Sequence, residues 1–188
     1  VLRIAGETLR GWIRDNPDCT VFSIAQNDWD NHCACPDCMA LETAEGSPAG
    51  PMLRFVNQLA DSIAKDYPGV LLHTFAYQYT RKAPKTIRPR PNVIVRLCDI
   101  ECCFSHPLDG TLPENAVLEP KALQPGNRQC GADGETPFLR DLAEWSGLCD
   151  RLYVWDYVTD FTNYLMPFPN FAALQRNLQL FKRYGVAG

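Results

Sequence analysis

Two carboxylic acids stand two positions apart, at Asp99 and Glu101, shortly after the apolar run at residues 93–97. Side chains at alternate positions of a strand point to the same side of the sheet, so an extended backbone here would bring the two acids together. Neighbouring carboxylates repel when both are charged, which raises one pKa and lets that group keep a proton. The spacing therefore indicates a general acid. The competing interpretation is that either acid caps a turn or pairs with Arg96 or His106.

Polar side chains also follow the apolar run at residues 20–25, where Gln26, Asn27 and Asp28 stand in a row. Their amide and carboxylate groups can hydrogen-bond the hydroxyls or the acetamido group of a sugar. The alternative is turn chemistry, because Asn and Asp are common in turns. The cluster by itself does not decide between the two.

Aromatic residues gather at the ends of two further apolar runs, Tyr77 and Tyr79 after one, and Trp155 and Tyr157 after the other. Aromatic rings with polar rims can stack on the faces of pyranose sugars, and they are also ordinary core residues. Asp156 lies between two of these aromatic residues, where a carboxylate is costly to bury without a partner. We therefore include Asp156 among the candidate catalytic acids.

One histidine and three cysteines lie within seven positions, at His32, Cys33, Cys35 and Cys38. Such a set could bind one zinc ion in a closed structural site. The spacing lacks a clean second CxxC pair, so a disulfide or unpaired thiols stay open as alternatives. The chain has nine cysteines in all, and the odd number leaves at least one thiol outside any set of internal disulfides.

The hydrophobic pattern predicts helices and strands that largely alternate along the chain. The predicted helices cover residues 2–14, 52–67, 138–148 and 170–184. The predicted strands cover residues 20–25, 70–79, 93–97 and 151–156, and residues 107–137 are predicted to be irregular. Strands that are apolar almost throughout are typical of parallel strands buried on both faces. The pattern therefore predicts an α/β domain, either a doubly wound sheet or part of a (β/α)8 barrel.

No glycine-rich phosphate loop follows any predicted strand, which disfavours a nucleotide-binding doubly wound sheet. All four predicted strands instead end in polar or aromatic clusters, and in a (β/α)8 barrel these ends converge on the active-site face. Four strands are too few to close an eight-stranded barrel. We therefore expect residues 1–188 to be a fragment of a TIM barrel, about half of it and incomplete at both ends.

The overall charge excludes some partners. The net charge is -4 and the isoelectric point is about 5.3, whereas nucleic-acid binding needs a basic face. No apolar run approaches the ~20 residues that cross a bilayer. We therefore expect neither a nucleic-acid partner nor a transmembrane segment.

Several strings, taken together and in order, resemble the family called domain of unknown function 4838. The strings are QND at 26–28, CACPDC at 33–38, FAYQYT at 75–80, NVIVRLC at 92–98, IECCFSHP at 100–107 and YVWDY at 153–157. They span nearly the whole chain. That family overlaps glycoside hydrolase family 163, whose members are endo-β-N-acetylglucosaminidases acting on complex N-glycans.

The resemblance implies that residues 1–188 are the C-terminal part of a TIM-barrel glycosidase domain with a glycan or glycoprotein substrate. It also implies substrate-assisted retention, in which the acetamido oxygen of the substrate attacks the anomeric carbon. One acid then protonates the leaving oxygen and a second polarises the acetamide, unlike the usual pair in which a carboxylate is the nucleophile. On this resemblance Glu101 is the proton donor, and Asp99, Asp28 and Asp156 are candidates for the second acid.

The remaining expectations concern binding residues, cofactors and location. The expected substrate-binding residues are Gln26, Asn27, Tyr77, Tyr79, Trp155, Tyr157 and His106. No cofactor is expected for catalysis, and a structural zinc ion at residues 32–38 stays an alternative. The full-length protein is expected to be periplasmic, cell-surface or secreted. Two other functions stay open: a non-catalytic carbohydrate-binding barrel, and a zinc- or thiol-centred protein built on the cysteine loop.

Overall fold

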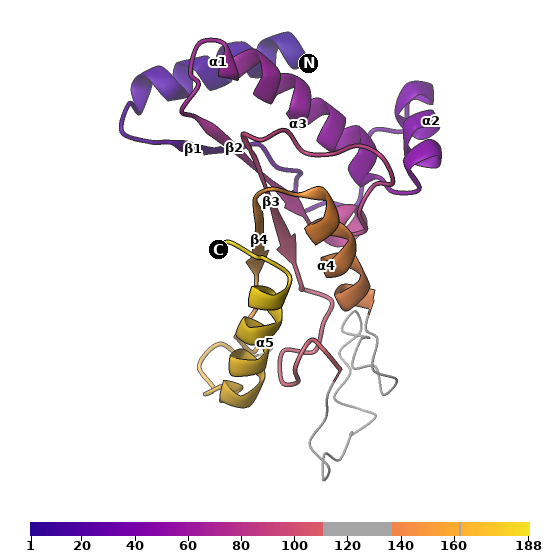
Figure 1. The fold of residues 1–188 in the computed structure, drawn as a ribbon, viewed down its shortest axis with the longest axis vertical. Helices are drawn as coiled ribbons and strands as arrows, with labels where there is room; N and C mark the ends of the chain where they lie inside the picture. The colour runs from indigo at the N-terminus through magenta and orange to yellow at the C-terminus, as the bar shows by residue number, and fades with distance from the viewer. Residues whose placement is uncertain (111–136, 162) are drawn as a thin grey trace.

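The computed structural model describes residues 1–110, 137–161 and 163–188, which contain five α-helices and four β-strands (Figure 1). The helices are α1 (Leu2–Asp15), α2 (Pro36–Glu45), α3 (Ala49–Ala64), α4 (Pro137–Leu148) and α5 (Phe171–Arg183). The strands are β1 (Val21–Ser23), β2 (Leu71–Ala76), β3 (Val93–Cys98) and β4 (Leu152–Trp155), and the 3-10 turn η1 (Gln78–Thr80) follows β2. Residues 111–136, most of the stretch predicted to be irregular, lie outside the described ranges.

The four strands form one parallel sheet in the order β1-β2-β3-β4, so spatial neighbours are also neighbours in the sequence. Phe22 pairs with Leu72, Leu72 with Val93, and Val95 with Leu152. A doubly wound sheet reverses its strand order at a switch point, and the described strands show no such reversal. The predicted α/β class with parallel strands is confirmed.

One face of the sheet is covered by α1, α3, α4 and α5. Alternate strand residues point to this face because successive side chains of a strand alternate between its two sides. The strand side chains in this core are Phe22, Leu72, Ala76, Val93, Val95, Leu97 and Leu152. Phe138 and Trp145 of α4 are the largest fully buried side chains, and burying an apolar side chain of this size contributes about 2–3 kcal/mol. In Figure 1, α1 and α3 lie together over one end of the sheet, and α4 and α5 lie beside β3 and β4.

The other face of the sheet carries polar and aromatic side chains. The guanidinium carbon of Arg96 lies 5.8 Å from the ring centroid of Tyr153 and 5.7 Å from that of Trp155, within range of a cation–π contact. His73 is buried on this face, and burial together with the charge of Arg96 lowers its pKa to about 4. Its Nδ1 lies 3.0 Å from the hydroxyl of Ser23. This face therefore differs from the helix-covered face, where the strand side chains are mainly apolar.

The structure differs from the sequence prediction at two places. Residues 36–45, predicted to belong to a loop, form α2, in which Glu45 alone is buried. No apolar stripe marks this helix, but Pro36 in its first turn and Gly46 at its end, with a φ of 67°, are ordinary helix boundary signals. The strand predicted over residues 70–79 ends at Ala76, because the chain turns at Tyr77 into η1.

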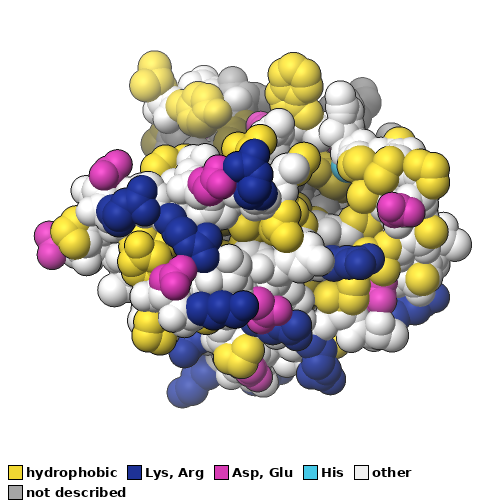
Figure 2. Space-filling model, turned by 90° about the horizontal axis from the view of Figure 1, so that it is seen from above, with side chains coloured by type: hydrophobic (Ala, Val, Ile, Leu, Met, Phe, Trp, Pro, Cys, Tyr) yellow, Lys and Arg dark blue, Asp and Glu magenta, His cyan; other side chains and the backbone are white. Residues whose placement is uncertain are grey.

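Charged side chains of both signs mix on the outer face of the α1 and α3 layer. Figure 2 shows this face, on which several of the basic side chains have acidic neighbours. Arg10 pairs with Asp66 and Arg90 pairs with Asp61, both at 2.9 Å. Among the described residues, no helix combines the length and the apolar character needed to span a bilayer.

Candidate functional site

A pocket of about 180 Å³ lies at the carboxyl ends of the strands. Its lining comes from all four strand ends: Gln26, Asp28, Phe75, Tyr77, Cys98, Trp155 and Tyr157. Five of these seven are predicted site residues, and Phe75 and Cys98 are additions. The parallel sheet explains the convergence, because the carboxyl ends of parallel strands meet at one edge.

Hydrogen bonds hold the polar groups of this pocket in place. The Tyr77 hydroxyl donates to Asp28 Oδ1 at 2.9 Å, and it accepts a hydrogen bond from Gln78 Nε2 at 3.1 Å. Burial, followed by the hydrogen bond to Asp28, raises the pKa of Tyr77. The Gln26 side chain donates to the carbonyl of Tyr77 at 3.0 Å and accepts from the hydroxyl of Thr80. Asp28 and Gln26 are therefore pre-positioned hydrogen-bonding groups.

A row of aromatic rings runs from the pocket along the segment after β4, and we call it the aromatic row. The centroid distances are 5.9 Å from Phe75 to Trp155 and 6.0 Å from Trp155 to Tyr157. The row continues over 5.7 Å to Phe161 and a further 5.9 Å to Tyr164. Tyr164 is 71% exposed. The row therefore gives ring faces to a ligand both inside the pocket and beyond it.

Asp99 and Asp156 are neighbouring acids, each next in sequence to a residue that lines the pocket. Asp99 is 1% exposed, and its Oδ1 accepts a hydrogen bond of 3.1 Å from the backbone N–H of Tyr157. Its Oδ2 has no donor among the described residues. Burial, then the hydrogen-bonded contact with Asp156 and its charge, raises the pKa of Asp99 well above the ordinary value. Asn177 Nδ2 lies 3.3 Å and 3.2 Å from the two oxygens of Asp156. The raised pKa favours a protonated Asp99, which removes the charge repulsion between the two carboxyl groups.

The raised pKa of Asp99 predicts how the stability of the fold depends on pH. An unfolded Asp titrates near ~3.9, whereas the pKa of folded Asp99 is higher. The folded state therefore binds more protons than the unfolded state between these two values, and Asp99 lowers stability as pH rises. Asp99→Asn keeps an oxygen for the Tyr157 N–H and supplies a permanent donor to Asp156. We expect this variant to lose the pH-dependent term and to be at least as stable as wild type at neutral pH.

Urea unfolding from about pH 5 to about pH 8 measures this effect as the free energy of unfolding. Asp18→Asn is the matched control, because Asp18 is exposed in a turn. An unchanged pH slope in Asp99→Asn would show that Asp99 does not carry the extra proton.

Glu101 lies beside the pocket and is held by Arg81. The Arg81 Nη1 donates to Glu101 Oε2 at 2.8 Å, and its Nε donates to Asp141 Oδ2 at 2.7 Å. The Arg81 side chain is 11% exposed and that of Asp141 is 3% exposed. Glu101 lies in the turn closed by the 2.7 Å bond from the N–H of Cys102 to the carbonyl of Asp99. The acid next to Asp99 is therefore Asp156, the residue that follows β4, and the counter-ion of Glu101 is neither Arg96 nor His106 but Arg81.

The charge of Glu101 nevertheless contributes to the raised pKa of two residues that line the pocket, Cys98 and Tyr157. Burial raises the pKa of Cys98 to about 12, and the charges of Asp99 and Glu101 add to the effect. Burial also raises the pKa of Tyr157, with smaller contributions from nearby groups that again include Glu101. Glu101 is thus an electrostatic neighbour of the pocket wall.

Three of the predicted substrate-binding residues lie outside the pocket lining. His106 Nδ1 is 3.0 Å from the sulfur of Cys103. The ring of Tyr79 stacks on that of His32 with a centroid distance of 4.9 Å. Asn27 is exposed in the loop after β1. None of the three is among the residues that line the pocket, and their role in substrate binding stays a prediction.

Three predicted metal ligands converge. The sulfur atoms of Cys33, Cys35 and Cys38 all lie within 4.8 Å of one another, and none of the three is in a disulfide. His32 is not part of this group, since its Nε2 contacts Glu42 Oε2 at 3.1 Å. The backbone N–H of Cys38 and the thiol of Cys33 lower the pKa of Cys35.

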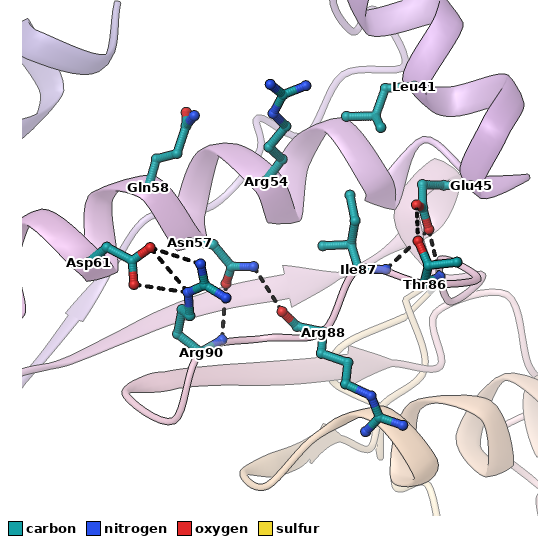
Figure 3. Close-up of a pocket in the computed structure, with 10 residues that line it drawn as sticks. All are labelled: Leu41, Glu45, Arg54, Asn57, Gln58, Asp61, Thr86, Ile87, Arg88 and Arg90. Atoms are coloured by element: carbon teal, nitrogen blue, oxygen red, sulfur yellow. Dashed lines mark hydrogen bonds and ion pairs between the residues drawn. The ribbon is translucent and has the colours of Figure 1, made fainter.

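A larger hollow of about 590 Å³ lies on the helix-covered side of the sheet, between α2, α3 and residues 86–90 (Figure 3). Buried Glu45 accepts a hydrogen bond of 2.7 Å from the N–H of Thr86. Asn57 Oδ1 accepts one of 3.0 Å from the N–H of Arg90, whose side chain pairs with Asp61. The polar side chains around this hollow thus bind residues 86–90 to α2 and α3. We therefore infer that they stabilise the fold and that the hollow is not the functional site.

The sequence analysis missed Arg81, Asp141 and Asn177, which complete the networks around the acids. Asp141 lies on the apolar stripe of α4, three residues after Phe138 and four before Trp145. Asn177 likewise belongs to the buried stripe of α5. A polar residue on the apolar face of a helix costs stability unless it has a partner. That break in the helical pattern is the signal that could have identified both residues.

These features define a parallel α/β protein with a polar and aromatic pocket at the carboxyl ends of its strands and two neighbouring acids next in sequence to the pocket lining. The family described as Domain of unknown function (DUF4838) matches residues 1–188. The chain therefore belongs to this family, as its sequence motifs predicted. Searches of curated proteins and of solved structures gave no match.

Proposed function

We propose that this protein is a glycoside hydrolase that cleaves β-linked N-acetylglucosamine in glycans by a substrate-assisted retaining mechanism. The observation that carries the proposal is the pocket at the strand ends, which combines ring faces with a fixed carboxylate and a fixed amide. Rings of Trp and Tyr suit the apolar faces of sugars. Amide and carboxylate groups suit the sugar hydroxyls and the acetamido group.

The proposal includes a (β/α)8 barrel to which this sheet belongs. Consecutive parallel strands with their helices on one face are the repeating unit of such a barrel. The edge of β4 supports an additional strand: the N–H of Ala187 donates to the carbonyl of Leu152 at 2.8 Å, and the N–H of Val154 donates to that of Gly188 at 2.8 Å. Catalytic residues of these barrels lie at the carboxyl ends of strands, where the pocket lies here.

The proposed chemistry divides the roles among the acids. The acetamido oxygen attacks the anomeric carbon as the glycosidic bond breaks, and the leaving oxygen takes a proton from Glu101. For this step Glu101 has to leave its ion pair with Arg81 and take up a proton from solvent before it gives that proton to the leaving oxygen. Asp28 is the acid that lines the pocket, so we assign it to the acetamido group. The Asp99–Asp156 pair holds the backbone of Tyr157 and so fixes one wall of the pocket.

A second candidate function is carbohydrate binding without cleavage. The ion pair itself favours this alternative, because Arg81 occupies one oxygen of the proposed proton donor. On this view the aromatic row and Asp28 would bind a glycan, while Glu101 and Asp141 would serve to hold Arg81.

An assay on an N-glycoprotein tests the proposal, with released glycans identified by mass spectrometry and glycan binding measured by calorimetry. We expect the protein to release glycans cut at an N-acetylglucosamine linkage. Trp155→Ala should weaken both binding and release, whereas Trp12→Ala should affect neither. The two tryptophans are matched in exposure, at 44% and 49%, but Trp12 lies on α1 away from the strand ends. Binding without release would favour the second candidate, and the absence of both would exclude a glycan ligand of this kind.

A further inference from the structure

We propose that Cys33, Cys35 and Cys38 bind one zinc ion as three thiolate ligands, with a water molecule at the fourth position. The proposal stands on the convergence of the three sulfur atoms within 4.8 Å of one another. It is independent of the proposed glycosidase activity, because the site is defined by the loop between β1 and α2 and not by the pocket.

The sulfur positions are close to those that zinc requires. Zinc–sulfur bonds of about 2.3 Å in a tetrahedral site place neighbouring sulfurs roughly 3.8 Å apart. The sulfur–sulfur distances of up to 4.8 Å would therefore have to shorten by about 1 Å or less when zinc binds. None of the three sulfurs is in a disulfide, so each is available to a metal.

The local backbone brings the ligands together. Cys35 is the N-cap of α2 and has an extended backbone, with φ of -68° and ψ of 156°, and Pro36 starts the helix. The N–H of Met39 donates to the carbonyl of Cys35 at 3.0 Å and closes the first turn of the helix. The first turn of α2 thus places Cys38 close to Cys35, and Cys33 lies in the loop that precedes the helix. Two of the ligands are exposed and Cys38 is partly buried, so solvent has access to the fourth position.

A zinc ion bound by these cysteines would restrain the loop that carries Asp28 by linking it to α2. Residues 24–35 connect β1 to α2 without regular secondary structure. His32 already anchors this loop, through its contact with Glu42 and its stacking on Tyr79. Metal binding would add a second anchor by joining the loop to the first turn of α2. Thiol protons leave to solvent as the ligands bind, so binding should weaken at low pH.

Elemental analysis of the protein purified without chelators tests the proposal. We expect one zinc per chain, and we expect each of Cys33→Ser, Cys35→Ser and Cys38→Ser to lose it. Cys19→Ser should keep the metal, because Cys19 is an exposed thiol outside the group. Replacement of zinc by cobalt should give thiolate-to-cobalt charge-transfer absorption, which reports on the ligands even if a variant folds poorly. Proteolysis at residues 24–35 should accelerate when a chelator removes the metal.

Two results would overturn the proposal. One is a wild-type protein that takes up no zinc or cobalt while its three thiols stay reduced. The other is a disulfide between any two of Cys33, Cys35 and Cys38, detected by peptide mass mapping under non-reducing conditions. Because these readouts do not use activity, loss of the glycosidase proposal would leave them unaffected.

Discussion

Replacing Glu101 with Gln is expected to lower the rate of glycan release at least ~100-fold, the low end of what a general acid contributes. The Gln side chain has nearly the same shape, and its amide oxygen can still accept the hydrogen bond from Arg81 that Glu101 accepts at 2.8 Å. The variant should therefore fold and bind glycan, but it has no proton to give to the leaving oxygen. The measurement is kcat on an N-glycoprotein, together with glycan affinity.

Glu144→Gln is the matched control for this prediction, because Glu144 is exposed on α4 near the same network. Asp28→Asn provides the second comparison. If Asp28 holds the acetamido group, its loss should raise KM as well as lower kcat. If Glu101→Gln stays active and Asp28→Asn does not, the roles assigned to the two acids have to be exchanged.

Replacing Arg81 with Met is expected to lower the free energy of unfolding by about 3–5 kcal/mol. The substitution removes the guanidinium between two acids and leaves Asp141, which is 3% exposed, as a buried charge without its counter-ion. The other oxygen of Asp141 already has no hydrogen-bond partner among the described residues. The effect can be measured by urea unfolding monitored by circular dichroism.

A double substitution separates the lost counter-ion from lost packing. Arg81→Met combined with Asp141→Leu removes both charges and should recover most of the stability, since buried pairs can often be replaced by apolar groups. Arg90→Met is the surface control. Arg90 and Asp61 are each about half exposed, with values of 50% and 52%, so its cost should stay at about 0–1 kcal/mol. An equal loss in both single variants would show that burial of Asp141 does not determine the effect.

The strongly periodic elements could be predicted from the sequence. The helices around residues 2–14, 52–67, 138–148 and 170–184 and the strand at 93–97 match α1, α3, α4, α5 and β3 within a few residues. Apolar periodicity works for these segments because each buries one face. It fails for α2, whose boundary residues are informative but whose side chains are mostly exposed. The full barrel stays a proposal, because four strands do not define how a sheet closes.

Most residues of the candidate site could be predicted from the sequence, but which acid lies next to which could not. The rule that residues two apart share a face holds only while the strand continues, and β3 ends at Cys98, one residue before Asp99. The coupling of Asp99 to Asp156 instead follows from the register in which Cys98 pairs with Trp155. The next residues of the two strands are then neighbours. Register between strands is a long-range property that local spacing does not encode, which is why Asp99 was matched with Glu101.

All four strands run in the same direction, so the edge of the sheet where strands end differs from the edge where they begin. Every residue that lines the pocket belongs to a strand end or to the segment that follows it. The segments that precede the strands make stabilising contacts instead, such as the 3.1 Å bond from Asn92 Nδ2 to the carbonyl of Ala60 and the 3.0 Å bond from Arg151 Nε to that of Pro91. Sequence change in the segments that follow the strands can therefore alter the candidate site while the contacts that hold the sheet are kept. Libraries randomised there, with Gln26, Asp28, Cys33 and Cys35 left unchanged, should diversify recognition more readily than they compromise expression.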